Sequence, residues 1–400
     1  MPPFEGRRLW FVGIGGAGLS GYAVVAQAWG GEVGGWDRHE TPYLEHVRAA
    51  GIPVTISPEP PPAPGGWESV VSTAFRGKAE GTSRADFLAE LVSHARAIVV
   101  AGAHGKTTTA AMIAFVLDRL GLDPSFLIGG EVPQLGGNAR AGSGWLVVEG
   151  DESDRTVFGL TAEIAVITNV DLDHHTTFSS ATELDDAFAE WARGLAPGQV
   201  VWGRDLEPVD FELAVPGEHN RLNAACALAA LQLAGVAPDD AVAALKEFGG
   251  AGRRLEDRGE AGGVHILDDY GHHPAEITAT LAAVKTLANG GRVLVLFQPH
   301  LYSRTQHLVA ELAEALSGAD LAAVTDIYPA REDPLEGVSG KLVVDRLTEV
   351  RPGMRVGWTP TIEQGAEFLA AFARAGDLAL TIGAGNVDEA VPLLLQRLAR

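Results

Sequence analysis

A glycine-rich turn that carries a lysine constrains the fold of this chain more than any other stretch. It spans residues 102–108, follows an apolar run over 97–101 that predicts a buried strand, and precedes a stretch over 110–120 that predicts a helix. Amides of such a turn can cradle phosphates, the Lys106 ammonium can reach the β- and γ-oxygens, and the Thr107 hydroxyl can ligate Mg²⁺. Val100 stands where the common phosphate loop has its first glycine. A turn without a ligand is the weaker interpretation, because a lysine in a glycine turn gains nothing from packing.

A second glycine turn lies near the N-terminus. Gly13, Gly15 and Gly18 have the spacing of a dinucleotide fingerprint between a predicted strand and a predicted helix, and Asp37 ends the next strand. The glycines let backbone amides approach a diphosphate, and the aspartate can accept from a ribose hydroxyl. Taken alone, the pattern favours NAD or FAD. Any diphosphate-linked nucleotide presents the same groups, however, and a tight turn without a ligand remains an alternative.

Strands and helices alternate along all 400 residues, a length too great for one hydrophobic core. We therefore predict an α/β protein of three domains. A Rossmann-like domain is expected over 1–93, a central P-loop-type domain with a parallel sheet over 94–250, and a second Rossmann-like domain over 251–400.

The formal net charge of −22 argues against nucleic acid or an anionic membrane surface as a partner, because both favour a basic footprint. The sequence contains no apolar run of membrane-spanning length and no predicted signal peptide, so we expect a cytoplasmic protein. The single cysteine, Cys226, cannot form an internal disulfide or a cysteine zinc site, and its alanine-rich surroundings predict a small core residue.

Acidic residues follow two further apolar strands. Glu149 begins the cluster 149–154, and the cluster 169–175 contains His174. Hard oxygen ligands beside a phosphate turn are what Mg²⁺ requires, and a histidine can join a second metal position. A solvated acidic loop is the ordinary alternative for either cluster alone. In the last third of the chain, 268–274 and 298–305 each place histidines after a strand, where they can bind metal, carry protons or serve a structural role.

These stretches, taken in order from Gly13 to Asn386, resemble the Mur ligase family. The resemblance also rests on Gly252-Arg253-Arg254 and on Gly383-Ala384-Gly385-Asn386. The amino-acid sequences of 268–274 and 297–305 resemble those of the alanine-adding branch of the family.

The resemblance implies a role for each matched position. ATP would be bound by Gly102, His104, Gly105, Lys106, Thr107, Thr108, Asn220, Asn223, Arg254 and Asp269. The UDP-sugar would be bound by Gly13, Gly15, Gly16, Ala17, Gly18, Asp37, Ser72, Tyr270 and His272. The metal ligands would be Thr107, Glu149 and His174, and the catalytic groups Lys106, His174, His300 and Arg304.

The activity implied is ligation of L-alanine to the lactyl carboxylate of UDP-N-acetylmuramate, with ATP and Mg²⁺ as cofactors, through an acyl phosphate. Because residues from three domains must meet around the reacting groups, we expect domain closure on ligand binding. The expected partners are these small molecules only, with a monomer or a weak dimer as the assembly.

The chain departs from the family pattern at several points. Ala103 replaces a usual threonine, and Leu301 replaces an arginine expected near the substrate. Between His175 and Pro216 the chain lacks a block that the family uses for a small antiparallel sheet, so we expect a trimmed central domain; a shorter gap lies between Ser72 and Arg84. No lysine occurs between His175 and Pro216, which agrees with the alanine-adding branch.

Three other functions are compatible with parts of this pattern. A recycling ligase would attach a whole peptide to the same sugar nucleotide. A sugar-nucleotide sensor would keep the glycine turns without catalysis, as Leu301 and the trimming suggest. An NAD-dependent oxidoreductase rests on the first glycine turn alone and leaves the Lys106 turn unexplained.

Overall fold

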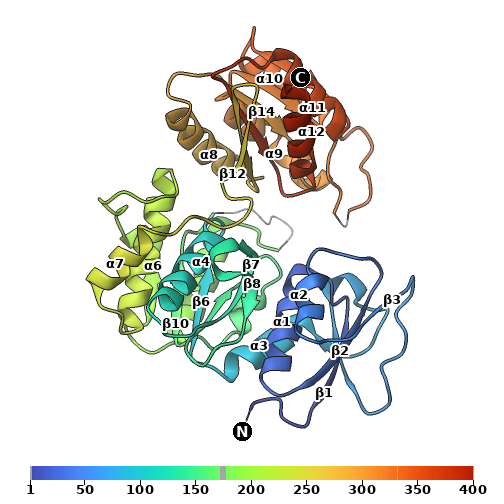
Figure 1. Cartoon of the computed structure of the whole chain (residues 1–400), viewed down its shortest axis with the longest axis vertical. Coiled ribbons are helices and arrows are strands. Elements are labelled where there is room, and N and C mark those ends of the chain that lie inside the picture. The colour runs from blue at the N-terminus through green and yellow to red at the C-terminus, as the bar shows by residue number, and fades with distance from the viewer. Residues whose placement is uncertain (1, 172–176, 331, 400) are drawn as a thin grey trace. The chain divides into compact units, whose positions relative to one another are not determined.

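The computed structural model describes residues 2–171, 177–330 and 332–399. They form two compact units (Figure 1). Unit 1 comprises Met1–Ala214 and Asn220–Ala251, and unit 2 comprises Val215–His219 and Gly252–Arg400. Unit 1 contains two sheets and unit 2 contains one.

The first sheet of unit 1 has the strand order β3-β2-β1-β4-β5, and all its strands are parallel. Its strands are β1 (Arg8–Val12), β2 (Glu32–Asp37), β3 (Val54–Ile56), β4 (Glu68–Val71) and β5 (Thr82–Ser83). Its helices are α1 (Ala17–Ala28), α2 (Leu44–Ala49) and α3 (Arg84–Ser93). This βαβ arrangement brings the turn before α1 to the carboxyl ends of the strands, where α/β sheets bind ligands.

The second sheet of unit 1 has the order β11-β10-β6-β9-β7-β8, in which only β8 runs antiparallel. Its strands are β6 (Ala97–Ala101), β7 (Ser125–Val132), β8 (Gly137–Arg140), β9 (Leu146–Glu149), β10 (Ile164–Ile167) and β11 (Val200–Trp202). Its helices are α4 (Lys106–Arg119), α5 (Ala181–Arg193), α6 (Glu218–Leu233) and α7 (Pro238–Leu245). Between 177 and 216 the chain forms α5, β11 and one 3-10 turn, with no antiparallel sheet among these described residues.

Unit 2 is built on a sheet of order β12-β13-β17-β14-β15-β16, in which only β12 is antiparallel. Its strands are β12 (Glu256–Ala261), β13 (Val264–Asp269), β14 (Val293–Phe297), β15 (Leu321–Val324), β16 (Arg355–Trp358) and β17 (Leu378–Ile382). Its helices are α8 (Pro274–Leu287), α9 (Tyr302–Leu316), α10 (Lys341–Val350), α11 (Ile362–Phe372) and α12 (Ala390–Leu398).

Alternation along the strands explains how unit 2 buries both faces of its sheet. Leu267 belongs to one buried cluster and its neighbour Ile266 to another, because successive side chains of a strand point to opposite faces. The predicted α/β fold of three domains is confirmed as three mainly parallel sheets, two of which belong to unit 1. The predicted bounds of the domains stay a prediction. No helix in the described parts of the chain is both long and apolar enough to cross a bilayer.

Candidate active site

The Lys106 turn connects β6 to α4 and is shaped by glycines at positive φ. Gly102 has a φ of 123° and Gly105 a φ of 77°, a region that L side chains rarely adopt. A Cβ on Gly105 would lie 2.2 Å from Asn223 Oδ1, and one on Gly102 would lie 2.3 Å from Thr168 Oγ1. Both positions therefore require glycine for conformation and for space.

The Lys106 side chain is held over this turn. Its Nζ donates to the Gly102 carbonyl at 2.6 Å and lies 3.0 Å from Glu152 Oε2. The Glu152 side chain is only 1% exposed. Burial would lower the pKa of Lys106, but the charges of Glu152, Glu149 and Asp151 outweigh it and raise the pKa. The ammonium thus remains charged at a buried position where phosphate oxygens would need a cation.

An oxygen-rich position lies beside the lysine. The Thr107 hydroxyl donates to the Glu149 carboxylate at 3.0 Å, and the Gly129 amide donates to Glu149 Oε2 at 2.7 Å. No group of three or more His, Cys, Asp or Glu side chains gathers as a metal site among the described residues. A hydroxyl and a single carboxylate nevertheless fit Mg²⁺, which in nucleotide sites takes one or two carboxylates together with phosphates and water. The predicted second metal ligand, His174, lies outside the described residues.

The backbone of the turn is held by Asn169, which follows β10, and Asn223 of α6 lies close to it at Gly105. The His104 amide donates to Asn169 Oδ1 at 2.9 Å, and the Asn169 side-chain amide donates back to the His104 carbonyl at 2.8 Å. Asn223 donates to Asn220 Oδ1 at 3.2 Å. Of the residues predicted to bind ATP, those in unit 1 are therefore brought together around this turn.

The first glycine turn has no lysine and is organised by a carboxylate. Gly15 donates its amide to Asp37 Oδ2 at 2.7 Å, and Arg38 donates its amide to Asp37 Oδ1 at 2.7 Å. A Cβ on Gly15 would lie 2.9 Å from Asp37 Oδ2, whereas one on Gly16 would meet nothing closer than 3.5 Å. Asp37 therefore shapes the turn, and its predicted contact with the ribose stays a prediction.

The predicted UDP-sugar residues of unit 1 lie around this turn. A Cβ on Gly13 would lie 2.8 Å from the Cβ of Ser72, and one on Gly18 would lie 2.9 Å from Arg84 Nε. Ser72 accepts from the Ala74 amide at 3.4 Å and so caps a short 3-10 turn, Thr73–Phe75. Gly16 is the N-cap residue of α1 and Ala17 its first residue.

In unit 2, two aspartates at the end of β13 are buried and bonded. Asp269 accepts from the amides of Leu255 and Gly271 at 2.9 and 2.8 Å, and burial raises its pKa to about 6. Asp268 accepts from Arg253 Nε at 2.9 Å. Arg254 lies 3.7 Å from Glu276 and places its guanidinium over the Tyr270 ring. Asp269 and Arg254 thus hold the loops at this sheet edge.

The substrate residues predicted for unit 2 also lie close together. The rings of Tyr270 and His272 are 5.8 Å apart, and those of His272 and His300 are 5.6 Å apart. Arg304 NH1 lies 3.1 Å from His300 Nδ1. These residues follow β13 and β14, which are separated by one strand, so the topology brings them to one edge of the sheet.

Sequence reasoning missed two residues at this edge and the partner of the lysine. Tyr328 stacks on His300, and Glu332 binds the start of α9. Glu152 was noted only as part of an acidic cluster, although it is the partner of Lys106. A carboxylate three residues after the predicted metal ligand Glu149 was the available signal for Glu152. Nothing in the spacing indicated Tyr328 or Glu332.

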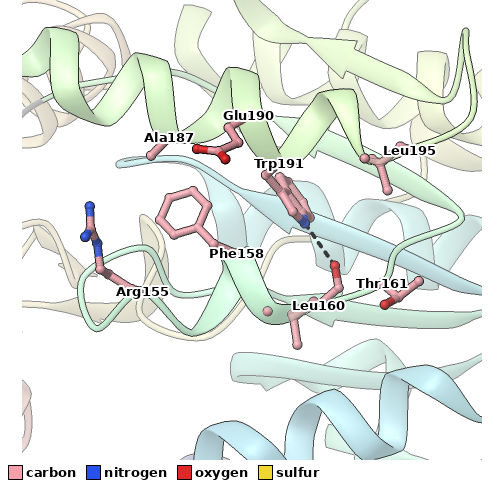
Figure 2. Close-up of a pocket in the computed structure, with 10 residues that line it drawn as sticks. Arg155, Phe158, Leu160, Thr161, Ala187, Glu190, Trp191 and Leu195 are labelled. Atoms are coloured by element: carbon pink, nitrogen blue, oxygen red, sulfur yellow. Dashed lines mark hydrogen bonds between the residues drawn. The ribbon is translucent and has the colours of Figure 1, made fainter.

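A separate pocket of about 540 Å³ lies between α5 and the 3-10 turn Thr156–Gly159 (Figure 2). Phe158, Leu160 and Trp191 line it, and the Trp191 indole donates to the Leu160 carbonyl at 2.9 Å. None of the predicted site residues lines this pocket. Cys226 is buried, as predicted, and burial raises the pKa of its thiol to about 11.

Models of Mur ligase domains match most of the chain. The catalytic domain of the Mur ligase family matches residues 8–96, the Mur ligase middle domain 100–207, and the Mur ligase glutamate ligase domain 253–385.

Among curated proteins, UDP-N-acetylmuramate–L-alanine ligase of Renibacterium salmoninarum is 38% identical, covering 98% of this chain and 96% of that protein. The protein of that name from Kineococcus radiotolerans is 39% identical with the same coverage. The alignment with the Renibacterium protein spans 453 positions against 400 residues here, so the relative carries residues that this chain lacks.

Solved structures agree on the fold. The UDP-N-acetylmuramate–alanine ligase of Thermotoga maritima has a TM-score of 0.80 at 24% identity and covers 98% of both chains. A murein peptide ligase of Psychrobacter arcticus has a TM-score of 0.67 at 23% identity and covers 99% of both chains.

Proposed function

This chain belongs to the Mur ligase family, and we propose that it joins L-alanine to UDP-N-acetylmuramate and converts ATP to ADP and phosphate. The observation that carries this proposal is near-full-length identity of 36–39% to several UDP-N-acetylmuramate–L-alanine ligases. The Lys106 turn supports it independently, because its geometry suits an ATP-driven reaction.

The chemistry follows from the weakness of a carboxylate as an electrophile. The lactyl carboxylate attacks the γ-phosphorus of ATP, the bond to ADP breaks, and an acyl phosphate forms. The neutral amine of alanine then attacks the acyl carbon. The tetrahedral intermediate loses phosphate as its leaving group, the nitrogen loses a proton, and an amide remains. Both steps build negative charge on oxygens, which fixed cations stabilise.

Residues of unit 1 would serve the phosphoryl transfer. Lys106 would turn from Glu152 and the Gly102 carbonyl toward the β- and γ-phosphates, since it is already charged and held above the turn. Thr107 and Glu149 would hold Mg²⁺, which supplies charge neutralisation of the phosphates when bound. The first amides of α1, at Ala17 and Gly18, would face the diphosphate of the sugar nucleotide, because the Gly15 amide is bonded to Asp37 and the Gly16 amide to the Gly13 carbonyl.

Residues of unit 2 would bind the amino acid and the muramyl carboxylate. Arg304 is 8% exposed and lies against His300, so its guanidinium is held in one place rather than sampling solvent. A fixed guanidinium pairs with a carboxylate in a defined orientation. His300 and His272 would bound the space for the amine.

The test is phosphate release from ATP with Mg²⁺, UDP-N-acetylmuramate and L-alanine, each omitted in turn. We expect release only with all four, and one amide formed for each phosphate. Release that does not need the sugar nucleotide would contradict the ligase. Preference for a peptide over L-alanine would assign the chain to the recycling reaction, and sugar-nucleotide binding without turnover would assign it to sensing.

A further inference from the structure

The segment after β15 packs against the residues that we assign to substrate binding in unit 2. His300 and Tyr328 form an isolated parallel bridge. The Tyr328 amide donates to the Pro299 carbonyl at 2.8 Å, and the Leu301 amide donates to the Tyr328 carbonyl at 3.0 Å. Backbone bonds on both sides of His300 therefore tie its main chain to Tyr328.

The side chains of the bridged pair are stacked as well. The rings of His300 and Tyr328 are 5.9 Å apart and inclined by only 12°. Tyr328 is itself confined, because a Cβ on Gly385 would lie 2.6 Å from Tyr328 Cγ. Arg304 NH1 lies 3.1 Å from His300 Nδ1. The imidazole therefore has an aromatic ring on one face and a guanidinium at one nitrogen.

A second residue of the same segment secures the start of α9. The N-cap residue of this helix, Leu301, has a φ of 67° and supplies no side-chain cap. Glu332 takes that place: the Ser303 amide donates to Glu332 Oε2 at 2.9 Å, and the Ser303 hydroxyl also donates to this carboxylate. A carboxylate at a helix N-terminus is stabilised by the exposed amides and the helix dipole.

The contacts of Tyr328 and Glu332 both act on the short segment 300–304, which joins the end of the β14 loop to α9. Leu301 lies at a positive φ, which a leucine keeps only when its surroundings impose it. Tyr328 holds His300, the residue before Leu301, and Glu332 holds α9, which begins after Leu301. His300 and Arg304 lie four residues apart on either side of Leu301, so their spacing depends on both contacts.

We propose that Tyr328 and Glu332 are positioning residues for the ligation, which hold His300 and Arg304 in the arrangement that receives the carboxylate and the amine. This inference rests on the proposed function. Neither residue is assigned to touch substrate. Their effect is on the orientation of the groups that do, and misplacement by about 1 Å costs on the order of 100-fold in rate for such groups.

The first test compares Tyr328→Leu with Tyr328→Phe. The phenylalanine keeps the stacked ring, whereas leucine replaces it with a smaller apolar side chain. For Tyr328→Leu we expect kcat/KM for L-alanine to fall about 10-fold to 100-fold. The KM for ATP and the thermal midpoint should stay close to wild type, and Tyr328→Phe should restore kcat/KM. A general structural role would instead lower the midpoint and affect both substrates together.

The second test keeps the proposal falsifiable if Tyr328→Leu does not fold. Glu332→Gln retains the shape and removes the charge that caps α9, and the exposed Glu336→Gln on the same loop is the matched control. We expect a loss in kcat/KM for L-alanine only in Glu332→Gln. Unchanged kinetics in both Glu332→Gln and Tyr328→Leu, or an equal loss in Tyr328→Phe and Tyr328→Leu, would overturn the proposal. Failure of the wild type to form the amide would overturn the proposed function instead.

Discussion

The two glycine turns of unit 1 are similar in sequence, but different charged side chains contact them. Both join a buried parallel strand to a helix. In the first, the Asp37 carboxylate accepts from the Gly15 amide. In the second, the Lys106 ammonium lies over the Gly102 carbonyl and pairs with Glu152. The first turn has the Asp37 carboxylate at its amides and the Arg84 guanidinium beside Gly18, whereas the second carries its cation, Lys106, within the turn itself. The glycine spacing therefore indicates a turn that can bind phosphate groups. The charged residue at the turn indicates whether the turn binds a diphosphate or serves phosphoryl transfer.

The largest effect should come from removing that cation. Lys106→Ala is expected to lower phosphate release on the order of 10³-fold, because a fixed charge on the transferring phosphoryl group is lost. Binding of UDP-N-acetylmuramate, measured by calorimetry, should stay within about twofold of wild type. The exposed Lys285 on α8 gives the control, Lys285→Ala, with unchanged turnover. Loss of sugar-nucleotide binding in Lys106→Ala would contradict the assignment of the sugar nucleotide to the first turn and of ATP to the second.

The second largest effect should come from metal removal, which should weaken ligand binding at the second turn and not at the first. In the second turn the Thr107 hydroxyl donates to the Glu149 carboxylate, whereas in the first the Thr41 hydroxyl donates to the Gly15 carbonyl. Excess EDTA should abolish phosphate release and weaken ATP binding strongly, since the phosphates then lack a counter-charge. Sugar-nucleotide binding without ATP should be nearly unaffected. An equally strong metal requirement for both ligands would contradict the assignment of the metal to the second turn.

Alanine substitutions in each turn should give opposite defects. Gly105→Ala forces a positive φ on alanine and places its Cβ 2.2 Å from Asn223, so ATP affinity should fall, with a strain of about 1–3 kcal/mol. Gly15→Ala places its Cβ 2.9 Å from the Asp37 carboxylate, so sugar-nucleotide affinity should fall instead. Calorimetry with each ligand checks both variants. A shared loss of both affinities would indicate disruption of unit 1 as a whole.

Gly16→Ala is the smallest and most discriminating change. An added Cβ would meet no atom of the protein closer than 3.5 Å, so the free energy of unfolding should hardly change. If the diphosphate crosses this residue, affinity for the sugar nucleotide should drop about tenfold, which is about 1.4 kcal/mol. ATP affinity is the internal control. Full sugar-nucleotide affinity in this variant would place the diphosphate elsewhere on the sheet edge.

Local patterns predicted the strands and helices that carry both turns well. The strand 97–101 was predicted with the bounds that the structure has. The helix after the second turn was expected from residue 110 but begins at Lys106, because the glycine turn itself ends in the first helical residue. Among the described residues, seven strands were not predicted: β3, β5, β7, β8, β11, β12 and β16. All except β7 lie at sheet edges, where apolar patterning is weakest.

The sequence by itself determined the phosphate turn, the acidic residue beside it and the family, because glycine conformation and charge act over a few residues and leave a local signature. Only the tertiary structure decided the partners. Asp37 closing the first turn, Glu152 holding Lys106 and Tyr328 stacking on His300 join residues 22, 46 and 28 positions apart. Strand order and loop packing set such contacts, and a pattern read along the chain does not contain them. The sequence therefore predicted both turns, but only the tertiary structure showed that Asp37 bonds the first turn and that Glu152 pairs with the lysine of the second.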